Sequence, residues 1–193
     1  MDTYLVSTVL VALAEMGDRT QLLAIMLASR YHRAPQILLG ILVATLANHF
    51  VAALAGFYLS RLLSSDWFRY AVSASFIAMA VWALIPDKEG DEDKASRSRM
   101  GVFVTTAISF FLVEIGDKTQ IATAALAARF HDVLLVAAGT TTGMMIANIP
   151  AVLLGRGVTR VLPIGVLRVA AALVYLGLGI WGVAATAGWI SPR

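Results

Sequence analysis

The sequence predicts an all-α integral membrane protein with six transmembrane helices, arranged as two inverted three-helix repeats. Of its 193 residues, 59% are hydrophobic and 14% are charged, whereas soluble domains carry about 25% charged residues. The apolar residues form six long segments, and one charged heptapeptide recurs 99 residues later. The composition therefore places the chain in a lipid bilayer, and the recurrence divides it into two related halves.

Each apolar segment is long enough to cross a bilayer, which takes about 20 residues of helix. The segments cover residues 4–29, 35–62, 67–86, 101–128, 133–157 and 163–188. Several exceed one bilayer thickness, so we expect tilted, kinked or unwound helices. Gly17, Gly116 and Pro150 mark positions where a break is tolerated if it lines a cavity. Gly139 and Gly143 have the GxxxG spacing of close helix contact.

A hydrophilic stretch separates the two halves. We predict a first repeat over residues 1–86, a cytoplasmic linker over 87–99 and a second repeat over 100–193. Each half has three segments, an odd number, so the second half must cross the membrane in the opposite sense to the first. This inverted arrangement brings the two heptapeptides together near the middle of the membrane.

The Lys and Arg residues of the connections predict the orientation of the chain. Nine lie on the side of the first, third and fifth connections: Arg30, Arg33, Lys88, Lys94, Arg97, Arg99, Arg156, Arg160 and Arg168. Four lie on the other side: Arg61, Arg69, Arg129 and Arg193. Because cytoplasmic connections are enriched in Lys and Arg, we expect both termini to lie outside.

Charge and cysteine content exclude several functions. The formal net charge is +3, but the basic residues are scattered, and a nucleic-acid partner requires a basic patch or stripe. The chain has no Cys, which excludes disulfides, thiolate catalysis and thiolate metal sites.

The two charged heptapeptides lie inside apolar segments. Glu-Met-Gly-Asp-Arg-Thr-Gln occupies residues 15–21, and Glu-Ile-Gly-Asp-Lys-Thr-Gln occupies residues 114–120. A charged side chain at the bilayer centre costs about 2.5 to 3.5 kcal/mol, so such charges pair, line a wet cavity or bind an ion. The duplicated motif is therefore the candidate functional site.

On a continuous helix, the Glu, Asp and Gln of each motif are three residues apart and face one side. The expected ligands of a divalent cation are these carboxylates and amides: Glu15, Asp18, Gln21, Glu114, Asp117 and Gln120. An oxygen shell of this kind suits Mg²⁺, Mn²⁺ or Ca²⁺. Two threonines and two asparagines are further ligands or supporting hydrogen-bond donors: Thr20, Thr119, Asn48 and Asn148. For the asparagines, hydrogen bonding between helices explains the sequence equally well.

Each motif also supplies a basic residue. Arg19 and Lys118 follow Glu15 and Glu114 by four residues, the spacing of an acid-to-base pair on a helix. Four acids and two bases leave the empty site at −2, which one divalent cation or two protons neutralise. We therefore hypothesise that a divalent cation is exchanged for protons.

The pattern Glu-x-Gly-Asp-(Lys/Arg)-(Thr/Ser), present once in each half, resembles the manganese/calcium transporter family of Golgi, thylakoid and bacterial membranes, within the LysE superfamily. The resemblance covers the whole chain, and both motifs fit it without departure. It implies cation/proton antiport of Mn²⁺ or Ca²⁺ as transported substrates, without a permanently bound cofactor, and mainly manganese export in bacterial members. The six-segment length resembles the compact prokaryotic form, which implies a multi-pass protein of a prokaryotic cytoplasmic membrane.

Two other functional classes remain open from the sequence. An intramembrane aspartyl protease is one, because Asp18 and Asp117 each follow a Gly inside an apolar segment; it explains neither Glu15 nor Glu114. An ion channel or a non-transporting scaffold is the other. One copy of the chain contains both half-sites, so a monomer suffices, and the sequence leaves a homo-oligomer open.

Overall fold

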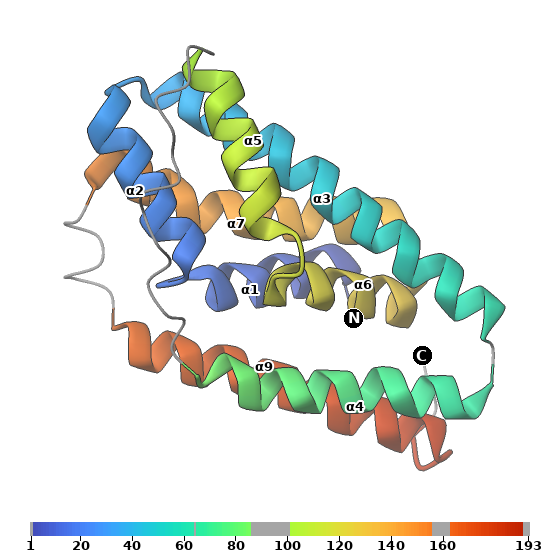
Figure 1. Cartoon of the computed structure of the whole chain (residues 1–193). Coiled ribbons are helices and arrows are strands. Elements are labelled where there is room, and N and C mark those ends of the chain that lie inside the picture. The colour runs from blue at the N-terminus through green and yellow to red at the C-terminus, as the bar shows by residue number, and fades with distance from the viewer. Residues whose placement is uncertain (1, 64, 86–100, 156–162, 191–193) are drawn as a thin grey trace.

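The computed structural model describes residues 2–63, 65–85, 101–155 and 163–190 of the chain (Figure 1). All regular elements within these ranges are helices. Their bounds are α1 Thr3–Glu15, α2 Arg19–Tyr31, α3 Ala34–Leu62, α4 Asp66–Ala83, α5 Val102–Glu114, α6 Lys118–Phe130, α7 Val133–Leu154 and α9 Ile164–Thr186. The predicted all-α class is confirmed, whereas the predicted linker at 87–99 lies outside the described ranges.

Apolar helices dominate the described structure. Three of them, α3, α7 and α9, are long and apolar enough to cross a membrane, and the shorter helices α1 and α5 are also apolar. Large hydrophobic side chains remain exposed on the long helices, such as Val51 on α3, Leu134 on α7 and Leu173 on α9. Exposed apolar surface on this scale marks contact with lipid or with another protein, and together with the span lengths it identifies a membrane protein.

Both segments that carry a heptapeptide are broken at that heptapeptide. The sequence predicts one segment over 4–29 and another over 101–128, with tolerated breaks at Gly17 and Gly116, and the structure has α1 followed by α2 and α5 followed by α6. Gly17 and Gly116 lie at the breaks with φ angles of +83° and +77°, a left-handed conformation that glycine adopts without steric penalty. Pro150, in contrast, lies inside the continuous helix α7.

The glutamine of each heptapeptide stabilises its break. The backbone N–H of Gly17 donates to Gln21 Oε1 at 3.0 Å. The equivalent bond of the second motif runs from Gly116 N to Gln120 Oε1 at 2.7 Å. An unpaired backbone N–H in an apolar environment is costly, so the motif contains both the residue that permits the break and the residue that satisfies its backbone.

Helix α1 packs against α7, and α5 packs against α3 through equivalent residues. A Cβ atom on Gly139 of α7 would lie 2.9 Å from the Ser7 side chain of α1. A Cβ atom on Gly40 of α3 would lie 2.8 Å from the Thr106 side chain of α5. Both glycines and both hydroxyl residues are 99 positions apart. The two halves therefore reuse one close helix contact, and Gly139 and Gly143 both approach the α1 backbone, as their spacing predicts.

Helices α4 and α9 form a closely packed pair that lies as a separate layer along α1 and α6 (Figure 1). Gly182 of α9 lies directly against Ser73 of α4. The rings of Phe76 and Tyr175 are 6.5 Å apart between centroids, and these two residues also occupy positions 99 apart in the sequence. The pair is therefore built from equivalent helices of the two halves.

The α4–α9 pair contacts the rest of the protein unevenly. Helix α9 packs against α1, and α4 packs against α6. If the two halves were arranged equivalently, α4 would pack against α5 and α9 would pack against α2. Among the described residues these two contacts are at most marginal. The two halves thus have equivalent parts in a non-equivalent arrangement.

Candidate metal centre

Three buried carboxylates converge where the two broken segments meet. Glu15, Asp18 and Asp117 are each no more than 3% exposed. Each offers an oxygen, and these atoms all lie within 4.8 Å of one another. Three acidic groups this close in a buried site repel one another unless a cation or protons compensate them. The structure therefore brings three of the four predicted carboxylates into one cluster that is suited to a cation.

Glu114, the fourth predicted carboxylate, lies outside this cluster. Thr45 Oγ1 donates to Glu114 Oε1 at 2.8 Å, and Asn48 Nδ2 donates to Glu114 Oε2 at 3.0 Å. The Asn48 amide also donates to the carbonyl of Phe111 at 3.0 Å. Asn48 thus holds a motif carboxylate in place, while Glu15, the equivalent of Glu114, belongs to the acidic cluster.

The basic residue of the first motif reaches across to the second motif. Arg19 Nη2 donates to Asp117 Oδ1 at 2.9 Å and to the carbonyl of Val113 at 3.1 Å. The prediction that Arg19 pairs with Glu15 on one helix is wrong in its geometry, because α1 ends at Glu15 and α2 begins at Arg19. For the same reason Glu15, Asp18 and Gln21 do not share one helix face; the break itself brings Glu15 and Asp18 together.

The glutamines of the motifs bond to the helix breaks, and the threonines lie two residues after the aspartates in sequence. Gln21 and Gln120 direct their side-chain oxygens to the glycine N–H groups of the breaks, and Gln21 Nε2 donates to the carbonyl of Ala147 at 3.0 Å. Thr119 Oγ1 donates to Asp117 Oδ2 at 3.2 Å. Thr20 is fully buried, and its hydroxyl has no hydrogen-bond partner among the described residues.

The two asparagines occupy different environments: Asn48 donates to Glu114, whereas Asn148 does not bond to a motif carboxylate among the described residues. Asn148 Nδ2 donates to the carbonyl of Met144 at 3.0 Å, within α7. Its Oδ1 is buried and has no hydrogen-bond partner in the described part of the chain. Because Gln21 contacts the neighbouring Ala147, this unpaired oxygen lies on the stretch of α7 that faces the first motif. A buried oxygen acceptor without a donor is a candidate cation ligand.

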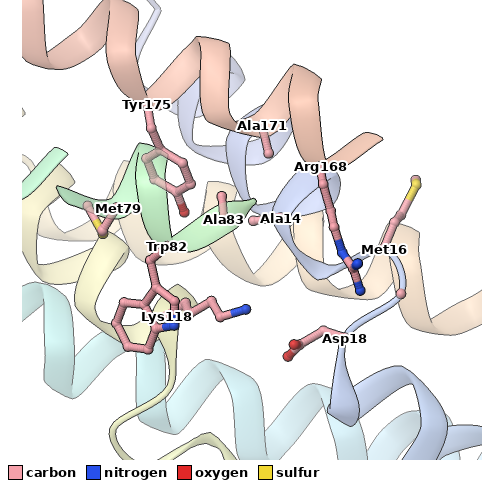
Figure 2. Close-up of a pocket in the computed structure, with 11 residues that line it drawn as sticks. Ala14, Met16, Asp18, Met79, Trp82, Ala83, Lys118, Arg168, Ala171 and Tyr175 are labelled. Atoms are coloured by element: carbon pink, nitrogen blue, oxygen red, sulfur yellow. The ribbon is translucent and has the colours of Figure 1, made fainter. Parts of the chain in front are cut away.

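A pocket lies between the first break and the α4–α9 pair (Figure 2). Asp18 lines it together with Lys118, Arg168, Trp82 and Tyr175. The Lys118 amine lies 5.9 Å from the centroid of the Trp82 ring. In Figure 2 the Lys118 amine and the Arg168 guanidinium extend into the pocket from different helices, with the Asp18 carboxylate between them. The buried Tyr175 hydroxyl has no hydrogen-bond partner among the described residues.

Arg168 lines this pocket although it belongs to neither heptapeptide. The sequence predicts that it lies in a connection, but α9 begins at Ile164 after Pro163, so Arg168 lies within the helix. The repeat contains the signal that identifies it, because Arg69 lies 99 residues earlier, within α4. Neither arginine is part of the heptapeptides, which is why spacing within the motif does not reveal them.

The helix ends at the breaks reinforce the electrostatics of the cluster. Helices α1 and α5 end at Glu15 and Glu114, and their terminal carbonyl groups carry partial negative charge. Helices α2 and α6 begin directly after Asp18 and Asp117, so the positive ends of their dipoles favour those carboxylates, although neither carboxylate accepts a capping hydrogen bond. Half-helix ends of this kind bind ions at the midplane of secondary transporters.

The family described as "Divalent cation/proton antiporter GDT1" matches residues 3–91 and 102–189 of the chain. The chain is 46% identical over 178 residues to a protein of Vibrio cholerae named "Putative manganese exporter", covering 91% of this chain and 88% of that protein. It is 30% identical over 168 residues to "GDT1-like protein sll0615" of Synechocystis, covering 76% of this chain and 80% of that protein. No solved structure matches the chain. The chain therefore belongs to the GDT1 family of divalent cation/proton antiporters, which makes it a membrane transporter of divalent cations and not an aspartyl protease or another enzyme.

Proposed function

We propose that this protein exports Mn²⁺ in exchange for protons and that Glu15, Asp18 and Asp117 bind the transported ion. The observation that supports the site is the convergence of the three carboxylates, whose oxygens lie within 4.8 Å of one another. The name of the Vibrio cholerae relative favours manganese as the substrate.

The spacing of the carboxylate oxygens is compatible with a hard divalent cation. Oxygens on opposite sides of an ion are about 4.2 Å apart for Mg²⁺ and about 4.6 to 5.2 Å apart for Ca²⁺. Oxygens that all lie within 4.8 Å of one another are therefore close enough to share one divalent cation, and this limit does not separate Mn²⁺ from Ca²⁺. Asn148 Oδ1 and the carbonyl end of α1 are the further oxygens that complete a shell.

The charge of the motifs supports proton exchange. Glu15, Asp18, Glu114 and Asp117 contribute four negative charges, and Arg19 and Lys118 contribute two positive charges. One divalent cation or two protons neutralise the difference. A buried site with excess charge is unfavourable. The empty site therefore favours binding of either the divalent cation or protons before the carrier reorients.

The proposed architecture has six spans in two inverted repeats, each span containing one long helix or one broken pair. The equivalent contacts of Gly40 with Thr106 and of Gly139 with Ser7 support the repeat. Because each half contributes three spans, the halves cross in opposite senses. A single copy contains both motifs, so we propose that a monomer is sufficient for transport.

The proposed location is a prokaryotic cytoplasmic membrane, with both termini outside. Arg69 and Arg168 lie within α4 and α9, and omitting them from the comparison of the two sides leaves eight basic residues against three. The excess still lies on the side of the first, third and fifth connections, which is therefore cytoplasmic.

Flux measurements in proteoliposomes test this function. Purified protein is reconstituted, and uptake of Mn²⁺, Ca²⁺ and Mg²⁺ is followed with fluorescent dyes, with and without an imposed pH gradient. We expect saturable Mn²⁺ movement that a pH gradient accelerates and that Glu15→Gln and Asp117→Asn abolish. Asp66→Asn, which removes an exposed carboxylate of α4, is the matched control and retains transport. Flux that does not depend on the pH gradient refutes proton exchange. Normal flux in both variants refutes the assignment of Glu15 and Asp117 to the cation site.

A further inference from the structure

Arg168 is a basic side chain on an apolar helix and shares a pocket with Asp18 of the acidic cluster. It lies in α9, which is otherwise apolar enough to cross a membrane, and it lines the pocket that contains Asp18 (Figure 2). Arg168 lies in the second turn of α9, and a basic residue within a membrane-spanning helix is unfavourable unless it reaches the interface or serves a site. The motif residues do not explain its presence, because Arg19 and Lys118 already supply one base to each motif.

The repeat provides a counterpart for Arg168 that is placed differently. Arg69 occupies the equivalent position of α4, 99 residues earlier. It lies within electrostatic range of Arg129, at the end of α6, and does not line the pocket at Asp18. Asp117, the equivalent of Asp18, is instead bonded to Arg19. Among the described residues, Arg168 therefore shares a pocket with an acidic motif residue, whereas Arg69 does not line that pocket.

The uneven packing of the α4–α9 pair explains this difference. The pair packs against α1 and α6, while the related contacts with α5 and α2 are marginal among the described residues. Within the pair, Gly182 lies against Ser73 and Phe76 contacts Tyr175, so the two helices form one unit. By the relation between the two halves, the equivalent arrangement is one in which this unit packs against α5 and α2 instead. In that arrangement Arg69 would stand to Asp117 as Arg168 stands here to Asp18.

From this we propose that Arg168 is the tethered counter-ion of the empty site at Asp18, and that Arg69 takes the same role at Asp117 when the carrier faces the opposite side. This inference rests on the proposed function. Because its guanidinium shares the pocket of Asp18, its positive charge repels a cation bound there, so it opposes tight binding and promotes release. Each arginine then governs access from one side of the membrane, and both are positioning residues that act through the ligand carboxylates.

Removing the charge of Arg168 should change the affinity for Mn²⁺ and the maximal transport rate in different ways. For Arg168→Gln we expect the half-saturating Mn²⁺ concentration to fall by at least about tenfold, because a nearby positive charge no longer repels the ion. We expect the maximal rate to fall as well, because release slows. Arg168→Lys preserves the charge and restores values close to the wild type, whereas a purely structural role would not be rescued in this way. Arg61→Gln is the matched control, since Arg61 is exposed and lies over the ring of Phe57.

Measuring Mn²⁺ affinity from each face of the membrane tests whether Arg168 and Arg69 act on opposite sides. In proteoliposomes with oriented protein, Arg168→Gln should lower the half-saturating Mn²⁺ concentration measured from one face, and Arg69→Gln should lower it from the other face. Unchanged values in Arg168→Gln protein that folds normally refute the counter-ion role, and effects of both variants on the same face refute the exchange. Absence of Mn²⁺ flux in the wild type would instead refute the proposed function itself.

Discussion

Arg19 donates a 2.9 Å hydrogen bond to the Asp117 carboxylate and thereby joins the basic residue of one motif to the acidic residue of the other. The Arg19 side chain is 39% exposed, whereas that of Asp117 is 4% exposed. The pair therefore connects a buried carboxylate of the acidic cluster to a partly exposed guanidinium. It also joins the two broken segments directly, at the level of the site.

Disrupting this pair is expected to show strong coupling between the two residues. Arg19→Ala leaves a buried carboxylate uncompensated, and Asp117→Asn removes the charge that needs compensation. We expect the double variant to be more stable than the sum of the single effects predicts, with a coupling energy of roughly 0.5 to 3 kcal/mol. Reversible unfolding in detergent measures the four proteins of the cycle, and additive effects would contradict the pairing.

The two motif glutamates are expected to differ in binding although their motifs match. Glu15→Gln removes one of the three clustered ligands, so we expect Mn²⁺ affinity to fall by at least about tenfold. Glu114→Gln alters a residue held by Thr45 and Asn48 outside the cluster, so affinity should change much less while transport is lost. Electron paramagnetic resonance of bound Mn²⁺ measures the affinities. Equal losses of affinity in both variants would contradict the asymmetry of the site.

Alanine at the two break glycines should destabilise the protein unequally. Gly17→Ala and Gly116→Ala both force a left-handed backbone on a residue with a side chain, which costs about 1 to 2 kcal/mol. A Cβ atom at Gly17 would also lie 2.5 Å from Ile164 Cγ2, whereas none of the described atoms outside its own neighbourhood lies within 4 Å of a Cβ atom at Gly116. We therefore expect the larger loss of thermal stability for Gly17→Ala. The added change Ile164→Ala should recover part of that loss and none of the loss in Gly116→Ala.

Cross-linking tests whether the α4–α9 pair moves during transport. The chain has no native Cys, so Ala14→Cys on α1 and Ala171→Cys on α9 introduce a single pair of thiols that faces one pocket. We expect a short, reducible bifunctional thiol reagent to stop Mn²⁺ flux and a reductant to restore it. The control joins Ser73→Cys to Gly182→Cys within the pair and leaves flux intact. Undiminished flux with α1 cross-linked to α9 would contradict the movement.

The sequence determined the class of the protein and the location of its chemistry. Hydropathy and segment length depend only on the order of residues along the chain, so the membrane class and the all-α fold could be predicted without tertiary information. Charged residues inside apolar segments are unfavourable unless they serve a site, and so Glu15, Asp18, Glu114 and Asp117 were identifiable as candidates. Two copies of one motif also revealed the duplication.

Only the tertiary structure decided how those residues are used. Helical spacing predicted shared faces, but the left-handed glycines break both helices at the motifs, and contacts across the breaks replace contacts along one helix. Arg19 therefore meets Asp117, and Glu114 is held outside the cluster. The position of Arg168 depends on which face of the repeat the α4–α9 pair packs against. The two halves share the motif but differ at many other positions, and the contacts of the α4–α9 pair come from packing between helices that are distant in the chain.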